Sequence, residues 1–150
     1  MGVVTPGAQA GMAVFVTDFP DLSLDGASPF VRTAGLVVDR AGGDLVEGHI
    51  DAGPEHHTPW GVVHGGLYTT AAETACSIGA SMAVAGDGQF SVGLSNATEF
   101  LRAHRAGRLD VRAVPVFQGR TGQVWQCDLT REDGKLVAQA RVRLQNVPSG

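Results

Sequence analysis

The sequence predicts an α+β fold in which one long helix packs against a curved antiparallel sheet of about six strands. Residues 65–84 form one amphipathic segment that is poor in bulky side chains, which predicts the helix. The runs after residue 89 alternate apolar and polar side chains and are separated by glycine-containing turns, which predicts the strands. A sheet wrapped around a single helix satisfies both patterns. With 150 residues, 43% of them hydrophobic, the chain is large enough to bury one core.

The domain follows a lead-in segment, residues 1–29. This segment is rich in Gly, Ala, Ser, Asp and Pro and shows turn signals without periodicity, so we expect a loose structure with room for one helical turn. Residues 30–150 are expected to form a single domain. Its first element is a predicted β-hairpin, whose arms at 33–40 and 44–50 flank a turn at 41–43.

The long helix is predicted for roughly residues 65–84, after a loop at 51–63 that contains two prolines. The triplet Gly86-Asp87-Gly88 supplies a strong stop signal. One buried stripe is predicted from five residues at spacings of three and four: Leu67, Ala71, Thr74, Ile78 and Met82. Because the rest of the helix is mostly Gly, Ala, Ser and Thr, it can lie very close to the sheet that covers it.

Four strands are predicted after the helix, and Pro115 within the second indicates a bulge or an edge. The turns between them lie at residues 103–107, at Gly119 and at the Glu132-Asp133-Gly134 hairpin signal. The predicted strands are residues 89–100, 108–117, 121–131 and 136–147.

Composition excludes several classes of protein. A net charge of −4 and a pI near 5.6 argue against nucleic acid as a main partner. We expect no membrane span, because no stretch approaches 18 apolar residues, and no secretory signal in residues 1–14, which contain no basic residue. Cys76 and Cys127 are expected to be reduced core thiols of a cytoplasmic protein.

The start of the helix contains groups suited to binding a negatively charged oxygen. The first N–H groups of a helix lack internal partners and lie at the positive end of its dipole. A carbonyl oxygen that gains charge in a transition state is stabilised by such donors. Gly65 and Gly66 let a ligand approach this backbone closely, although they equally suit tight packing of the helix on the sheet. His64, just before the helix, is expected either to bond a substrate carbonyl or to cap the loop.

Glu73 is the single carboxylate of this helix. It lies with Thr69 and Ser77, four residues away on either side, in a narrow polar strip. Its sequence context allows two environments. The carboxylate is exposed to solvent, as most glutamates are, or it lines a cleft and serves as a base.

A metal site is not expected from the histidines. Glu55-His56-His57 and His64 match no usual zinc spacing, and a loop brings only one or two of these side chains together.

The segment Trp60-Gly61-Val62-Val63-His64-Gly65-Gly66, with Glu73 following, resembles the acyl-CoA thioesterases of the hotdog-fold superfamily. Its nearest likeness is to the phenylacetate-degradation and 4-hydroxybenzoyl-CoA thioesterase types. Weaker similarities extend the resemblance over roughly residues 34–147: Ser95-Asn96, Glu99-Phe100-Leu101-Arg102, Gly107, Gly119-Arg120 and the run from Asp133 to Ala138.

The resemblance implies a hotdog fold, with chains paired side by side into one continuous sheet and dimers associated into a tetramer. The active site would lie at the dimer interface. Gly65 of one chain would polarise the thioester carbonyl and face Glu73 of the other, which would act as nucleophile or as general base. Ser77 would help to position the water or the carboxylate, and His64 would orient the loop or contact the thioester.

The resemblance also carries one departure and a set of coenzyme A contacts. Many relatives have Asn or Gln where this chain has Thr58, six residues before the histidine, and that amide is thought to hold the carbonyl or the water. Thr58 offers one hydroxyl, and His57 is a second candidate for the role. Arg102, Arg120 and Thr121 are expected to hold the phosphates of coenzyme A. No separate cofactor or metal is implied.

Two other functions remain open. A hotdog hydratase or dehydratase also uses helix-start N–H groups and a carboxylate, but often with Pro-Gly before the helix, where this chain has Val62-Val63. A non-catalytic acyl-CoA-binding protein is the third alternative, because Thr58 departs from the family pattern.

Overall fold

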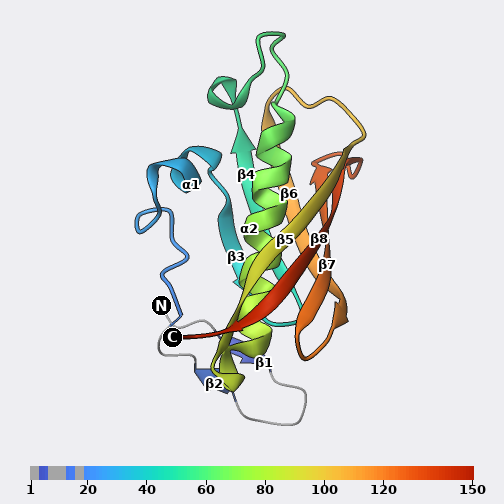
Figure 1. The fold of residues 1–150 in the computed structure, drawn as a ribbon. Coiled ribbons are helices and arrows are strands. Elements are labelled where there is room, and N and C mark those ends of the chain that lie inside the picture. The colour runs from blue at the N-terminus through green and yellow to red at the C-terminus, as the bar shows by residue number, and fades with distance from the viewer. Residues whose placement is uncertain (1–3, 7–12, 16–18) are drawn as a thin grey trace.

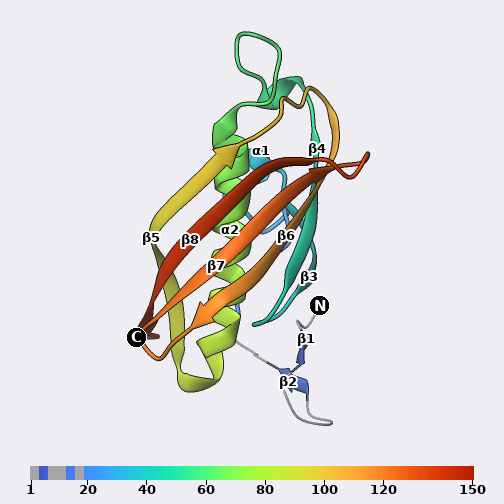
Figure 2. The ribbon, with the colours of Figure 1, turned by 90° about the vertical axis from the view of Figure 1, so that its right-hand side faces the viewer.

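The computed structural model describes residues 4–6, 13–15 and 19–150 of the chain. A six-stranded antiparallel sheet curves around one long helix, α2, so the predicted hotdog fold is confirmed (Figures 1 and 2). The strand order in the sheet is β3-β4-β6-β7-β8-β5. Its strands are β3 (Val37–Ala41), β4 (Val46–Ala52), β5 (Gln89–Phe100), β6 (Gly107–Gln118), β7 (Gly122–Arg131) and β8 (Leu136–Pro148).

The N-terminal part differs from the prediction. A short helix, α1 (Pro29–Ala34), occupies the beginning of the predicted strand at 33–40, and β3 starts only at Val37. Ser28 caps α1 by accepting from the Val31 N–H, and Gly35 ends it with φ 73°. The prediction for residues 1–29 lies partly outside the described residues. Within the described part, β1 (Val4–Pro6) and β2 (Ala13–Phe15) pair antiparallel, where no strand was predicted.

Helix α2 (Gly65–Val84) begins and ends where the sequence predicts. A short 3-10 turn, η2 (Ala85–Asp87), follows it, and Gly88 closes that turn with φ 67°. The predicted buried stripe is partly correct: Leu67, Ala71 and Met82 are buried, Ile78 is partly buried against the core, and Thr74 is only half-buried. The curved sheet covers a wider face, made of successive pairs of small residues that are buried: Ala71, Ala72, Ala75, Cys76, Gly79 and Ala80.

Close packing of α2 on the sheet depends on Gly79. A Cβ atom at this position would lie 2.4 Å from the ring of Trp125, which is fully buried on β7. Cys76 and Cys127 are free thiols in the same buried layer between helix and sheet, as predicted. The small residues of α2 therefore let the helix approach the large residues of the sheet.

Pro115 lies at a bulge, as predicted. The register between β6 and β7 shifts between Pro115 and Phe117. The pairing of β6 with β4 ends at Ala113. Pro115 lies beyond this point, so the backbone N–H that proline lacks is not needed for a hydrogen bond to β4.

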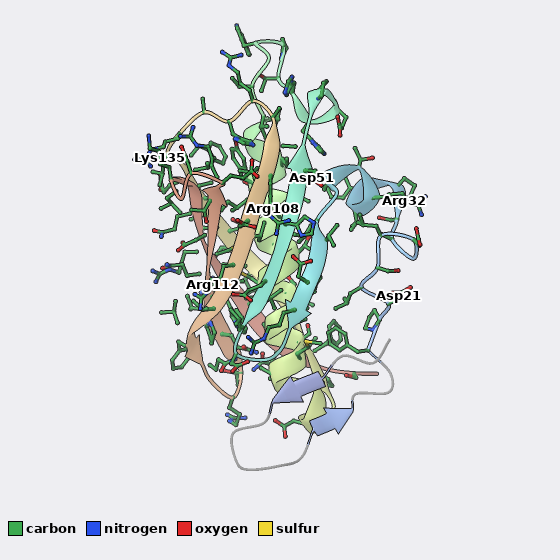
Figure 3. All side chains as sticks on the ribbon, turned by 180° about the vertical axis from the view of Figure 1, so that it is seen from behind. Asp21, Arg32, Asp51, Arg108, Arg112 and Lys135 are labelled. Atoms are coloured by element: carbon green, nitrogen blue, oxygen red, sulfur yellow. The ribbon has the colours of Figure 1, made fainter. Side chains whose placement is uncertain are left out.

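The outer face of β4 and β6 is charged. Asp51 of β4 and Arg108 of β6 are register partners, and Arg112 lies 3.5 Å from Glu47 on the next strand (Figure 3). On the other side of the sheet, β5 is an edge strand with β8 as its neighbour. Its exposed apolar residues, together with Leu101 beyond its end, are Phe90, Val92, Leu94 and Phe100. Val116 and Phe117, near the end of β6, are exposed as well.

Within the described part of the chain, no helix is long and apolar enough to cross a membrane.

Candidate active site

The start of α2 is fixed by His64. The imidazole Nδ1 accepts a hydrogen bond of 2.8 Å from the Gly66 N–H, which makes His64 the N-cap residue. The His64 N–H in turn donates to the His56 carbonyl at 2.8 Å and anchors the preceding loop. With the Gly66 N–H used by the cap, the Gly65 N–H is the donor left without a hydrogen-bond partner among the residues described. One helix-start donor is therefore available to a ligand.

Gly65 lies directly against an aromatic ring. A Cβ atom added there would lie 2.5 Å from a ring carbon of Phe100, at the end of β5. A cavity of about 230 Å³ opens beside the two residues. Its lining residues are Val63, Gly65, Tyr68, Phe100, Leu101, Arg102 and Ala103. Glycine at this position leaves room both for the ring and for access to the backbone.

Glu73 is half-buried and packs against β5. Its carboxylate accepts a hydrogen bond of 3.1 Å from Asn96 Nδ2 and one of 3.5 Å from Ser77 Oγ. Gly93 of β5 provides the space, since a Cβ there would lie 2.1 Å from Glu73 Oε1. The sequence left open whether Glu73 is exposed to solvent or lines a cleft. In the structure its side chain is half-buried on the side of α2 that faces the edge strand β5.

Asn96 is a site residue that the sequence analysis did not single out for a role. Its Oδ1 accepts from Thr98 Oγ1 at 2.7 Å, which leaves Nδ2 to donate to Glu73 and to the Thr69 carbonyl. The available signal was an asparagine in the middle of a predicted strand, where this residue type is disfavoured.

Gly65 and Glu73 lie more than two turns apart on the same helix. Eight residues separate them on one helix, and a rise of 1.5 Å per residue places them about 12 Å apart. Both nevertheless lie along β5, Gly65 beside Phe100 and Glu73 beside Gly93 and Asn96. A second copy of the chain paired at this edge would bring Gly65 of one chain to Glu73 of the other, as the resemblance implies.

Thr58 and His57 hold the loop before α2 in shape. The Thr58 hydroxyl accepts from the Trp60 N–H at 3.3 Å, and the Thr58 N–H donates to the Val62 carbonyl at 2.8 Å. His57 Nε2 lies 2.5 Å from the Arg105 carbonyl oxygen. Both side chains thus have a partner within this loop region.

The predicted coenzyme A residues are divided between the two ends of the β5–β8 pair. Arg102 lies beyond the end where Phe100 pairs with Ala138, and it donates to the Leu136 carbonyl at 2.7 Å. Arg120 and Thr121 lie toward the other end and line a second cavity of about 420 Å³ together with Leu94 and Arg143. Within one chain the structure does not bring Arg102 together with Arg120 and Thr121.

No group of three or more His, Cys, Asp or Glu side chains suited to a metal ion occurs in the described residues. The available chemistry is a backbone N–H donor and a carboxylate held by an amide. This pair can polarise a carbonyl group and activate water or attack the carbonyl directly.

Comparison with known proteins gives a consistent result. Residues 60–138 match the family model described as thioesterase superfamily. The proofreading thioesterase EntH of Cronobacter sakazakii is 30% identical over 121 residues, which covers 81% of this chain and 88% of that protein.

Solved structures agree with the sequence matches. The crystal structure of thioesterase HI1161 from Haemophilus influenzae is 30% identical with a TM-score of 0.77, and the match covers 87% of this chain and 94% of that one. A mutant of thioesterase PA1618 from Pseudomonas aeruginosa is 28% identical with a TM-score of 0.77 and coverages of 86% and 95%.

Proposed function

The chain belongs to the thioesterase superfamily, and from this premise we propose that it hydrolyses acyl-CoA thioesters with an aryl or medium-chain acyl group to the free acid and CoA. The supporting observation is the placement of two groups along the same edge strand: the Gly65 N–H, which has no hydrogen-bond partner in the described part of the chain, and the Glu73 carboxylate. The phenylacetate-degradation and 4-hydroxybenzoyl-CoA types remain the subfamilies that the motif favours. The reaction needs no separate cofactor, and we propose that it takes place in the cytoplasm.

The active unit in this proposal is a dimer formed through β5. In this dimer, β5 pairs antiparallel with its copy. The pairing is centred on the part of β5 between Phe100, which lies beside Gly65, and Gly93, which lies beside Glu73. Gly65 of one chain then lies opposite Glu73 of the other. The apolar side chains exposed on β5 favour such an association, and the unpaired edge of the strand supplies its hydrogen bonds. Two such dimers are proposed to form the tetramer.

Each residue then has a defined role. In the general-base form, Glu73 takes a proton from water as the water oxygen bonds to the carbonyl carbon, while the Gly65 N–H stabilises the oxyanion. The C–S bond breaks, and the sulfur of CoA receives the proton. In the nucleophilic form, a Glu73 oxygen bonds to the carbon, CoA leaves, and water hydrolyses the resulting anhydride.

The remaining residues support these steps. Ser77 and Asn96 orient the Glu73 carboxylate through their hydrogen bonds. His64 holds the helix start so that the Gly65 N–H stays free. Thr58 keeps the loop in place and occupies the position at which many relatives have the amide.

One CoA molecule is proposed to span both chains. Because Arg102 lies at one end of β5 and Arg120 with Thr121 at the other, antiparallel pairing brings Arg102 of one chain toward Arg120 and Thr121 of the next. Arginine suits the phosphates because its guanidinium forms bidentate hydrogen bonds.

The first test is release of free thiol from benzoyl-, phenylacetyl-, hexanoyl- and crotonyl-CoA. We expect release from at least one of them, and its loss in Glu73→Ala. Hydration of crotonyl-CoA without thiol release would favour a hydratase, and tight binding without turnover would favour a binding protein. A single turnover in oxygen-18 water separates the two forms, since label in Glu73 indicates the nucleophilic one.

The Gly65 donor is tested by a matched pair of variants. Gly65→Pro deletes the N–H at the first helical position, where proline is tolerated, and the extended His64 before it (φ −66°, ψ 134°) is compatible with a following proline. Loss of one such donor is expected to lower kcat by about 10²–10³-fold. Gly65→Ala keeps the N–H and controls for the added contact with Phe100.

Mixing inactive variants tests the two-chain site. A dimer of one Glu73→Ala chain and one Gly65→Pro chain has one site with both groups intact, so co-refolded chains are expected to recover about a quarter of the wild-type activity at most. Absence of any recovery, with mixed dimers shown by native mass spectrometry, would place both groups of a working site in one chain.

A further inference from the structure

Two buried amide side chains, Gln123 and Asn146, lie beneath the turn between β6 and β7. They are 1% and 7% exposed. The Trp125 indole N–H, which can only donate, bonds to Gln123 Oε1 at 2.9 Å and thereby directs Gln123 Nε2 toward Asn146 Oδ1, also at 2.9 Å. Ser91 Oγ donates to the same Asn146 oxygen at 2.8 Å. These contacts fix the orientation of the Asn146 amide, so its Nδ2 is directed away from the core and toward the turn.

The turn consists of Gly119, Arg120 and Thr121 and lies beside the end of β8, where Asn146 is located (Figure 2). Asn146 Nδ2 donates to the Gly119 carbonyl at 3.0 Å and to the Arg120 carbonyl at 3.2 Å. The Asn146 backbone N–H donates to the Thr121 carbonyl at 3.0 Å. In a planar trans peptide the C=O and N–H groups point in opposite directions. Because the Gly119 and Arg120 carbonyls point inward to a buried amide, the N–H groups of Arg120 and Thr121 point outward.

These two outward N–H groups have no hydrogen-bond partner among the described residues. The turn lines the 420 Å³ cavity together with Arg143 of β8, and the residues lining this cavity include no carboxylate. Arg120 and Arg143 form no ion pair within the part of the chain that the structure describes. Consecutive backbone N–H groups with a common direction, beside guanidinium groups, are suited to an anion with several oxygens, such as a phosphate. Leu94 of the edge strand also lines the cavity, but the donors described here belong to the turn and to β8.

We propose that Asn146 is a positioning residue for coenzyme A: it holds the carbonyl groups of the turn inward and so keeps the Arg120 and Thr121 N–H groups directed at a phosphate group of the bound CoA. The phosphate site then uses backbone donors as well as the Arg120 side chain, and it depends on a buried residue that the ligand does not touch. Without the Asn146 donor, the peptide groups of the turn are free to rotate and their N–H groups lose the common direction. This inference rests on the proposed function, because it takes CoA as the group that enters this cavity.

The test compares the CoA ester of one acyl group with its pantetheine ester, which carries no phosphate. Asn146→Asp keeps the oxygen that accepts from Ser91 and Gln123, but it replaces the Nδ2 donor with an oxygen that repels the turn carbonyls. Wild type is expected to have the higher kcat/KM on the CoA ester. The variant is expected to reduce the ratio of the two kcat/KM values by about tenfold, through the KM for the CoA ester rather than through kcat. Both esters are measured on the same preparation, so the ratio does not depend on the fraction of folded enzyme.

Two further variants separate loss of the donor from the added charge. Asn146→Leu removes the donor without adding a charge and should lower the ratio as Asn146→Asp does. Gln126→Glu makes the same amide-to-carboxylate change on β7, where the side chain contacts Arg141 outside the cavity, and should leave the ratio unchanged. If neither Asn146 variant folds, Ser91→Ala removes the hydroxyl that donates to Asn146 Oδ1 and is expected to lower the ratio by about 2–10-fold.

Three outcomes would overturn the proposal. Equal kcat/KM of wild type on the two esters would show that no phosphate is held, and equal losses on both esters in Asn146→Asp would show that the residue only stabilises the fold. A ratio lowered in Asn146→Asp but not in Asn146→Leu would assign the effect to charge repulsion.

Failure of the proposed function is distinguishable, since it appears as no thiol release from any thioester. In that case, calorimetric titration of free CoA and of pantetheine into wild type and Asn146→Asp still tests the positioning role. Weaker binding of CoA by the variant, with the affinity for pantetheine unchanged, would support it. Equal affinity of the two proteins for CoA would overturn it.

Discussion

Two residues of β5 position the Glu73 carboxylate: Gly93 leaves room for it, and Asn96 donates to it. Neither residue is itself able to act as an acid or base. The proposed mechanism nevertheless depends on them, because a carboxylate must approach a carbonyl of the partner's substrate at a defined distance. Substitutions in the strand should therefore affect the chemistry as directly as substitutions on the helix.

Gly93→Ala is expected to lower kcat by about 10²-fold, because the new methyl group displaces Glu73 Oε1 from a point 2.1 Å away. Steady-state kinetics of thiol release measure the effect, and circular dichroism verifies the fold. Gly86→Ala is the matched control, since no atom lies within 4 Å of a Cβ there. Full activity in Gly93→Ala would show that the position of Glu73 has no bearing on the reaction.

The thiol of Cys76 makes stability depend on pH. Contact with the Cys127 thiol, burial and the nearby Glu73 charge all raise its pKa in the folded chain. The unfolded thiol ionises near pH 8.5, so the stabilising contribution is complete below that pH and is lost as the pH rises above it. We expect the free energy of unfolding to fall above pH 8.5 by up to about 1.4 kcal/mol per pH unit from this thiol.

Urea unfolding of wild type and Cys76→Ala between pH 7 and 10 measures this contribution. The alanine variant is less stable throughout because it leaves a cavity, but its stability should decline less steeply above pH 8.5. Parallel slopes for the two proteins would contradict the predicted pKa direction.

Among the elements, α2 illustrates what the sequence allows one to predict. Its bounds were predicted correctly because the signals are local: the proline-containing loop at 51–63 precedes the helix, and the stop at Gly86-Asp87-Gly88 acts within one turn of its end. Its buried face was partly wrong, because burial depends on how far the sheet curves around it. Helix α1 was missed because Thr33–Gly35 continues smoothly into an apolar strand, although Ser28-Pro29 is a recognisable N-terminal signal.

The contact between α2 and β7 is expected to be intolerant of added volume. Glycine to alanine within a helix usually stabilises a protein by about 0.5–1 kcal/mol. Gly79→Ala should instead destabilise by about 1–3 kcal/mol, because its methyl group meets the Trp125 ring at 2.4 Å. Chemical denaturation measures the change. Adding Trp125→Phe to Gly79→Ala should reduce the destabilisation caused by the new methyl group, because the smaller ring leaves more room. Strictly additive changes in the free energy of unfolding would show that the two residues do not compete for space.

For the whole molecule, the proposed association through β5 rests on the exposed apolar side chains of this edge strand, whereas β4 and the first half of β6 carry charged pairs on their outer face. Glu73 and Gly65 were predictable as candidates from one sequence, because Glu73 is the single carboxylate of α2 and Gly65 lies at its start. Their 12 Å separation along that helix follows from the pitch. Asn96 and Gly93 were not predicted for a role, since only the folded strand brings them to the carboxylate.

Leu94→Lys is expected to convert the assembly to monomers and to reduce thiol release by more than about tenfold, because a charge on the edge strand opposes pairing. Light scattering after size-exclusion chromatography gives the mass, measured beside activity at the same protein concentration. Arg112→Gln on the outer sheet face is the control and should leave both unchanged. A fully active Leu94→Lys monomer would refute a site shared between chains.

The uninterrupted course of α2 between Gly65 and Glu73 also explains why the spacing in the His-Gly-Gly…Glu motif is informative. Inserting one residue between Gly65 and Glu73 would rotate the carboxylate by about 100° around the helix axis and turn it away from β5. A loop tolerates length variation, whereas a rigid helix converts a count of residues into an angle. In the proposed dimer, this interval sets the position of the acid relative to the Gly65 donor, and a relative with a different interval would have to build its acid–amide pair in another way.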